Sequence, residues 1–355
     1  MKAWVLHKID GLGLEEVPEP EVSAGEVLVE VKAAGICGSD IPRIYRTGTY
    51  SYPLIPGHEF SGIVVKTGAD TDEKWLGSRV GVFPLIPCRK CGPCRKGQYE
   101  MCRSYSYLGS RRDGGFAGYV AVPQENLIAL PDQVSFEEAA MLEPMAVAVH
   151  GMRRLNPAHS DTVVICGLGT IGLLLLLFLL DARTKAGADP GTVLAIGNKR
   201  FQREMACKIG LSEDSYCDSG KEEVGKWIME RTGGRGTDVF FECVGKNETL
   251  TWAVDSASPG GKLLLLGNPC SDMTLEKAVY WKILRNQLTV TGTWNSSFAR
   301  EAGDDWHYVL ECLVEGRIAP AQLITHRFPM EELDQGLHIM RDKTEDYVKI
   351  MGVWN

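Results

Sequence analysis

Four cysteines form the densest group of metal-binding side chains in this chain of 355 residues. They lie in the segment PCRKCGPCRKGQYEMC with the spacing C-x2-C-x2-C-x7-C, as Cys88, Cys91, Cys94 and Cys102. Four thiolates in a loop rich in glycine and proline suit the tetrahedral coordination of structural zinc, which leaves no position open for substrate. We therefore expect a zinc lobe over about residues 86–104 that depends on its metal for folding.

Two other kinds of cysteine site compete with this interpretation. The bacterial iron–sulfur spacing C-x2-C-x2-C-x3-C-P matches the first three cysteines, but not the seven-residue gap or the Arg103 that follows. A nucleic-acid zinc ribbon is opposed by charge, since 38 Lys and Arg against 46 Asp and Glu give a net charge of −8. Structural zinc remains the prediction, and nucleic acid is not expected as a partner.

A second metal site can be assembled from residues that are far apart in the sequence. They are Cys37 in AAGICGSD, His58 and Glu59 in PGHEF, and Glu143 in LEPMAVAVHG. Each one alone fits a packed core residue as well as a ligand. Cys37, His58 and Glu143 together offer a thiolate, an imidazole and a carboxylate, and they leave a fourth position for water or substrate. That set is typical of catalytic zinc.

Two neighbouring carboxylates can support this second site. Asp40 can orient His58 by accepting its second ring N–H, although it can equally cap a turn. Glu59 can act as an additional metal ligand that exchanges with water. Alternatively, it can only adjust the electrostatic environment of the ligand beside it.

A nucleotide site is indicated by a glycine motif between an apolar strand and an apolar helix. The expected strand is Thr162–Cys166, and the motif that follows contains Gly167, Gly169, Thr170, Ile171 and Gly172. In G-x-G-x-x-G the glycines permit the tight turn, the approach of the pyrophosphate and the packing of the helix. Further strands expected at Thr192–Ile196, Asp238–Val244, Lys262–Leu266 and Leu288–Thr291 predict a doubly wound α/β sheet.

The end of the second strand of this sheet favours NADP(H) over NAD(H). An acid there would bind the ribose 2′-hydroxyl, whereas cations would bind a 2′-phosphate. The chain instead has Gly197, Asn198, Lys199 and Arg200. Asp189 precedes Pro190 and so lies at the wrong end of the strand. The alternative is that Lys199 and Arg200 only cover the solvent face of the next helix.

Membrane insertion is the competing explanation for the apolar segment that contains the glycine motif. Val163–Leu180 is an uncharged, mostly apolar run of 18 residues, which reaches the lower limit for a transmembrane helix. The glycines within it favour a strand, a turn and a buried helix. We expect no membrane association and a cytoplasmic protein.

With GHE, the cysteine lobe, EP and GLGTIG along one sequence, the chain resembles the zinc-dependent medium-chain dehydrogenase/reductase superfamily along essentially its whole length. This resemblance implies a GroES-like β-barrel catalytic domain from residues 1–154 and 293–355, with a Rossmann cofactor domain at 155–292. It also implies a homo-oligomer, expected to be a dimer. By position it assigns catalytic zinc to Cys37, His58 and Glu143, with Glu59 beside them, and structural zinc to the four-cysteine lobe.

Two positions depart from the pattern of this superfamily. Many zinc alcohol dehydrogenases have a proton-relay histidine five residues after the ligand cysteine, where this chain has Pro42. We therefore expect Ser39, ribose hydroxyls or water to carry the proton. The other departure is Gly197, where NAD-dependent members have aspartate.

Several segments, among them CGSDIPRI and GSRRDGGFAGY, look most like galactitol-1-phosphate 5-dehydrogenases. The resemblance implies hydride transfer between a nicotinamide cofactor and a secondary alcohol of a polyol phosphate, with zinc as Lewis acid. Arg43, Arg111 and Arg112 are the candidate phosphate ligands, although an SRR sequence also suits a solvated turn. The alternatives are a sorbitol-type or amino-alcohol dehydrogenase, and a non-catalytic NADPH-binding sensor.

Overall fold

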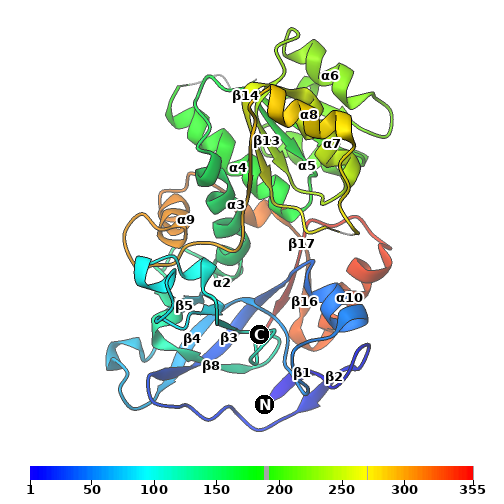
Figure 1. Ribbon diagram of the computed structural model, residues 1–355. Coiled ribbons are helices and arrows are strands. Elements are labelled where there is room, and N and C mark those ends of the chain that lie inside the picture. Colours follow the sequence, from blue (N-terminus) through cyan, green and yellow to red (C-terminus); the bar gives the residue numbers. More distant parts are fainter. Residues whose placement is uncertain (188–191, 270, 355) are drawn as a thin grey trace. The chain divides into compact units, whose positions relative to one another are not determined.

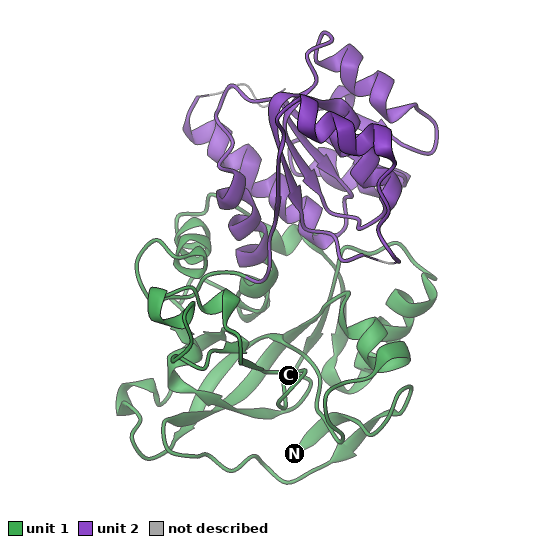
Figure 2. Ribbon diagram, viewed as in Figure 1, with its two compact units in different colours: residues 1–144, 296–355 green, residues 145–295 purple. Residues whose placement is uncertain are grey.

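The computed structural model describes residues 1–187, 192–269 and 271–354, which divide into two compact units (Figure 2). Unit 1 contains Met1–Pro144 and Ser296–Asn355, and unit 2 contains Met145–Asn295. Two distant parts of the sequence therefore build one body. The family resemblance of the sequence predicts boundaries at 154/155 and 292/293. Helix α3 (Leu142–Leu155) runs through the first division, so this boundary lies within a continuous helix.

A mixed sheet organises unit 1. Its strands follow the order β16-β17-β3-β4-β5-β9, and β8 also pairs with β3. Strand β3 is buried along nearly its whole length, as expected for a strand with neighbours on both edges. The bounds are β3 (Glu26–Ile36), β4 (Glu59–Thr67), β5 (Arg79–Val82), β8 (Tyr119–Pro123), β9 (Leu127–Ala129), β16 (Ile324–Pro329) and β17 (Lys349–Val353).

Shorter elements surround this sheet (Figure 1). Strands β1 (Lys2–Leu6) and β2 (Leu12–Glu16) form a hairpin, and β6 (Leu85–Ile86) pairs with β7 (Ser106–Tyr107) on either side of the cysteine lobe. The helices of this unit are α1 (Asp40–Pro42), α2 (Phe136–Ala140), α9 (Asp305–Val314) and α10 (Leu333–Asp342). Trp306 of α9 packs edge-on against Phe83, so the C-terminal segment shares the core of the N-terminal one.

Unit 2 is a parallel sheet of six strands in the order β12-β11-β10-β13-β14-β15. Helix α4 packs against β10 and β11, whereas α7 packs against β13 and β14 (Figure 1). The strands are β10 (Val163–Cys166), β11 (Val193–Gly197), β12 (Tyr216–Asp218), β13 (Thr237–Glu242), β14 (Ala257–Leu265) and β15 (Thr289–Gly292). The helices are α4 (Thr170–Lys185), α5 (Arg200–Lys208), α6 (Val224–Arg231), α7 (Asn247–Ser256) and α8 (Lys277–Arg285). The predicted doubly wound sheet is confirmed.

The apolar run Val163–Leu180 is divided between β10, a glycine turn and α4. Its leucines are buried in the core of unit 2 because α4 lies against the sheet. In the described part of the chain no helix is both long and apolar enough to span a bilayer.

Candidate metal and nucleotide sites

The carboxyl end of β3 is where the candidate catalytic residues of unit 1 meet. Strands β4 and β17 both run antiparallel to β3, so both begin where β3 ends. Cys37 follows β3, His58 and Glu59 stand at the start of β4, and Lys349 is the first residue of β17. Antiparallel pairing thus brings together side chains that are separated by about 20 to 300 positions in the sequence.

Three of the predicted residues could share one metal ion. Ligand atoms of Cys37, His58 and Glu59 all lie within 4.8 Å of one another. His58 is 4% exposed and Glu59 is 1% exposed. The fourth predicted residue, Glu143, is buried in the first turn of α3 and is not a member of this close group.

Glu143 is nevertheless part of the same buried environment. The Tyr107 hydroxyl donates to Glu143 Oε1 at 3.2 Å, and the Tyr107 ring lies 5.8 Å from the His58 ring. Burial raises the pKa of Glu143 to about 7, and the negative charge of Glu59 acts in the same direction. An ionised Glu143 would therefore be stabilised strongly by a nearby cation.

Asp40 links the metal-site residues to a fixed cation. Its carboxylate is fully buried, accepts the Cys37 backbone N–H at 3.0 Å and accepts Arg43 Nη1 at 2.7 Å. Its Oδ1 lies 3.4 Å from His58 Nδ1, which makes no hydrogen bond of good geometry to any residue that the structure describes. Asp40 is thus placed to orient His58 through Nδ1, which leaves Nε2 for a metal.

A buried ion pair stands beside this group. Lys349 Nζ is bonded to Glu59 Oε2 and donates to the Ile36 carbonyl oxygen at 3.0 Å. Gly35 makes the pair possible, because a Cβ at this position would lie 2.4 Å from Glu59 Oε2 and 2.7 Å from Lys349 Cε. The glycine lets the lysine reach across β3 to the glutamate.

These residues fit a zinc ion. Cys37, His58 and Glu59, with Glu143 buried nearby, offer a thiol, an imidazole and two carboxylates, which are all donor types that zinc binds. Asp40 and Tyr107 supply the surrounding hydrogen-bonding groups that metal ligands usually need. The assignment of ligands remains a prediction.

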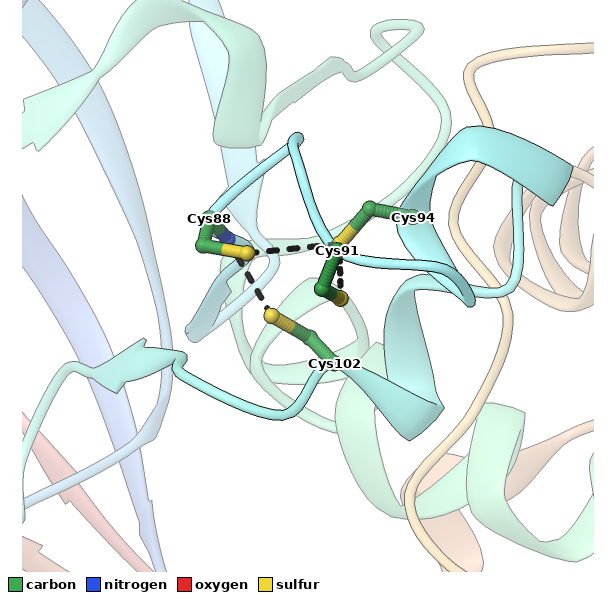
Figure 3. Close-up of side chains that lie close together, drawn as sticks. All are labelled: Cys88, Cys91, Cys94 and Cys102. Atoms are coloured by element: carbon green, nitrogen blue, oxygen red, sulfur yellow. Dashed lines mark hydrogen bonds between the residues drawn. The ribbon is translucent and has the colours of Figure 1, made fainter.

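The four lobe cysteines point their sulfur atoms toward one another (Figure 3). The Sγ atoms of Cys91 and Cys94 are 3.4 Å apart, and the Cys88 N–H donates to Cys102 Sγ at 3.2 Å. Backbone N–H donors lower the pKa of Cys91 to about 6, whereas burial raises the pKa of Cys94 to about 12. A divalent cation would stabilise all four thiolates, so the lobe fits structural zinc.

The glycine motif of unit 2 has the geometry that a nucleotide needs. Gly167 has φ +96°, and a Cβ there would meet Val244 Cγ2 at 2.5 Å. A Cβ at Gly172 would meet the Gly167 carbonyl at 1.9 Å, but Gly169 has open space around it. Thr170 and Ile171 begin α4. The first and third glycines therefore serve packing, and the second leaves room for a pyrophosphate at the helix N-terminus.

Tyr216 of β12 excludes a side chain at Gly197. A Cβ on Gly197 would lie 2.6 Å from the Tyr216 hydroxyl, which donates to the Lys199 carbonyl at 3.0 Å. Lys199 and Arg200 stand at the start of α5, and Asn198 precedes them. Arg200 is highly exposed and paired with Glu204. Asp189 lies outside the described residues.

The three candidate phosphate ligands have different surroundings. Arg43 is paired with buried Asp40, and Arg112 Nη2 lies 2.5 Å from Glu26. The Arg111 guanidinium lies between two rings, 4.1 Å from that of Tyr50 and 4.6 Å from that of Tyr105. The three arginines therefore differ in their partners, and two of them are already paired with carboxylates. Ser39 is half-buried at the start of α1.

Sequence reasoning missed three residues of these sites. Lys349 is a lone cation in the apolar segment VKIMGVW, which is a signal that could have been used. Tyr107 and Tyr216 carry no comparable signal, because their roles depend on packing against distant elements.

Family models match both parts of the chain. Residues 23–132 match the alcohol dehydrogenase GroES-like domain, and residues 175–315 match zinc-binding dehydrogenases. The chain is 33% identical over 335 residues to galactitol 1-phosphate 5-dehydrogenase of Escherichia coli K12, which covers 94% of each protein. It is 29% identical to sorbitol dehydrogenase of Bacillus subtilis 168, over 99% of this chain and 96% of that one.

Solved structures agree with these matches. Galactitol-1-phosphate dehydrogenase from Escherichia coli has a TM-score of 0.90 and 32% identity, over 99% of this chain and all of the other. A zinc-binding dehydrogenase from Sinorhizobium meliloti 1021 bound to NADP has a TM-score of 0.88 and 28% identity, covering 99% and 98%. A short chain alcohol dehydrogenase from Escherichia coli CFT073, complexed with NADH, has a TM-score of 0.89 and 28% identity over 100% of this chain and 99% of the other. The predicted GroES-like and Rossmann folds are confirmed.

Acidification should release the metal of the cysteine lobe. The pKa of Cys91 is depressed from 9.0 to about 6, so the stabilisation from its ionised form is present above pH 9 and is lost as the pH falls through about 6. We expect zinc release, followed with a chromogenic chelator, to rise below pH 6. Cys91→Ser should hold one zinc fewer and unfold at lower temperature. Cys207→Ser is the matched control, and equal zinc contents in the two variants would contradict the assignment.

Proposed function

Because the chain belongs to the zinc-dependent medium-chain alcohol dehydrogenase family, we propose that it transfers hydride between NADP(H) and a secondary alcohol of a polyol phosphate. The observation that carries this proposal is the close group of half-buried Cys37 with buried His58 and Glu59 at the end of β3, with buried Glu143 of α3 linked to it through Tyr107. Similarity to galactitol 1-phosphate 5-dehydrogenase over 94% of the chain supports the substrate class. We infer a keto-sugar phosphate as the product of oxidation.

Cys37, His58 and Glu143 would hold the catalytic zinc, with Glu59 beside them. When bound, the ion would act as a Lewis acid that lowers the pKa of the substrate hydroxyl or polarises the ketone. Ser39 would receive the hydroxyl proton and pass it toward solvent or the ribose hydroxyls, because Pro42 cannot. The alcohol thereby loses a proton and a hydride, and NADP+ gains the hydride.

Arg111 is the residue we propose for the substrate phosphate. Its guanidinium is held between Tyr50 and Tyr105, and one N–H donates to the Tyr105 carbonyl at 3.4 Å. Stacking fixes the plane of the guanidinium while its edge keeps donors for phosphate oxygens. The same loop contributes Tyr107 to the metal site, which supports a substrate that spans both. Arg43 and Arg112 are already paired with Asp40 and Glu26.

Initial rates with galactitol 1-phosphate and with galactitol, each with NADP+ and NAD+, test this function. We expect a strong preference for the phosphate. Arg111→Ala should raise KM for galactitol 1-phosphate about 10- to 100-fold, because one or two charge-assisted hydrogen bonds are lost. The kcat for the phosphate and the KM for the free polyol should stay unchanged. Arg112→Ala is the matched control.

Other outcomes of this experiment favour the alternatives. Preference for free galactitol would favour a sorbitol-type enzyme, for which the Bacillus subtilis relative is the precedent. Oxidation of amino alcohols instead would favour the relationship to L-threonine 3-dehydrogenases. Cofactor binding without turnover of any alcohol would favour an NADPH sensor.

The preference for NADP(H) is proposed from Gly197 and the cations that follow it. An acidic side chain at position 197 has no room beside Tyr216, and Lys199 and Arg200 follow at the start of α5. Replacing both cations by alanine should raise KM for NADP+ about 10- to 100-fold and leave KM for NAD+ nearly unchanged. Arg203→Ala, on the same helix and paired with Glu213, is the control. Equal changes for both cofactors would contradict the proposal.

We propose that the protein is a dimer formed through unit 2. Strand β15 is an edge of the parallel sheet, and its neighbour α8 exposes Tyr280, Trp281 and Leu284 by more than half. Val290 of β15 is also exposed. An unpaired strand edge flanked by apolar side chains suits antiparallel pairing with a second copy about a two-fold axis.

Trp281→Lys should therefore give a monomer in sedimentation velocity, because it places a charge within an apolar contact. Leu76→Lys changes an equally exposed side chain of unit 1 and should leave the assembly unchanged. A wild-type monomer, or a dimer that survives Trp281→Lys, would contradict the proposed contact.

A further inference from the structure

Two buried carboxylates stand beside the metal-site thiol and imidazole, but their surroundings differ. Glu59 is 1% exposed and is bonded to the ammonium group of Lys349. Glu143 is 8% exposed and accepts a hydrogen bond from the neutral hydroxyl of Tyr107. Among the described residues Glu143 has no ion pair. Only Glu59 therefore has its charge neutralised by a side chain.

Lys349 is fixed in this position from several sides. Its side chain is 1% exposed, and its Nζ also donates to the Ile36 carbonyl at 3.0 Å, directly before Cys37. Register places Ile350 opposite Ile36, and the missing side chain of Gly35 opens the route across β3. The lysine is thus held against both Glu59 and the strand that carries the candidate ligand cysteine.

The net charge of the site is the same whichever glutamate binds the metal, but the ion pairs in the structure favour one arrangement. Arg43 neutralises Asp40, and Lys349 neutralises Glu59. The Cys37 thiolate and the Glu143 carboxylate then remain, with two negative charges that one divalent cation would match. If the metal took Glu59 instead, the buried ammonium would lose its partner and Glu143 would stay uncompensated. Both changes are unfavourable in a dry interior.

We propose that Lys349 is a positioning residue that withholds Glu59 from the metal and so makes Glu143 the third ligand. This inference rests on the proposed catalytic metal site. Holding Glu59 back keeps the fourth coordination position open for the substrate oxygen. The ion pair thereby determines coordination number as well as ligand choice.

Cobalt substitution gives a readout that a merely structural lysine would not change. The visible spectrum of the Co2+-loaded protein reports coordination number, and the spectrum of Cys37→Ser, which retains only the cysteine lobe, is subtracted. Lys349→Met should release Glu59 to the metal. We expect a weaker band typical of higher coordination, slower removal of zinc by a chelator and a kcat at least about 100-fold lower, because the substrate position is closed.

Matched variants separate the ligand effect from a folding defect. Lys349→Arg keeps the charge and should retain the wild-type spectrum, and the double variant Lys349→Met with Glu59→Gln should restore it. In the wild-type background, Glu143→Gln should weaken zinc binding at least about 10-fold, whereas Glu59→Gln should change it little. This comparison of the two glutamates remains decisive if Lys349→Met does not fold.

Two results would overturn the inference. One is a folded Lys349→Met protein with the wild-type cobalt spectrum and zinc affinity. The other is loss of zinc in Glu59→Gln but not in Glu143→Gln, which would make Glu59 the ligand. If wild type and Cys37→Ser hold equal amounts of zinc, the proposed catalytic metal itself is wrong, so the two failures are distinguishable.

Discussion

Compensation of buried charge at the carboxyl end of β3 is the constraint on which the site in unit 1 depends. Asp40, Glu59 and Glu143 are each less than a tenth exposed, and Cys37 is beside them. An ionised carboxylate without a partner in such a place is costly, so each must be paired, take up a proton or hold a metal. Arg43 forms an ion pair with Asp40, and Lys349 forms one with Glu59. The Glu143 carboxylate has no ion-pair partner among the described residues, and a divalent cation would compensate it together with the Cys37 thiolate.

Strand pairing is what delivers these charges to one place. The central strand β3 ends where its two antiparallel neighbours begin, so residues near positions 37, 58 and 349 converge without any long loop. Gly35 contributes by having no side chain, because only then can Lys349 cross the strand. The same sheet that buries the core therefore also sets the electrostatics of the site.

The candidate nucleotide site of unit 2 is built from backbone groups and glycines rather than from paired buried charges. Its parallel strands end at one edge, where the motif glycines leave backbone N–H groups at the start of α4 and room for a pyrophosphate. At the end of β11, Tyr216 and Gln202 crowd the position of Gly197. The chain is 29–33% identical to relatives named for galactitol 1-phosphate, sorbitol and threonine, so membership of the family does not by itself set the substrate.

The sequence by itself determined the fold class, the glycine motif and the grouping of the four lobe cysteines. These features are local, because a glycine turn between an apolar strand and helix, or four cysteines within 15 residues, has its meaning within one short segment. The candidate ligands Cys37, His58, Glu59 and Glu143 could also be named, since their residue types and the family resemblance pointed to zinc.

Only the tertiary structure decided how these residues are paired. That Lys349 neutralises Glu59, that Tyr107 holds Glu143, that Tyr216 fills the space at Gly197 and that Arg111 lies between two tyrosines are contacts between distant positions. Sequence spacing cannot reveal them, because they depend on strand register and on which side chains a buried interior forces together.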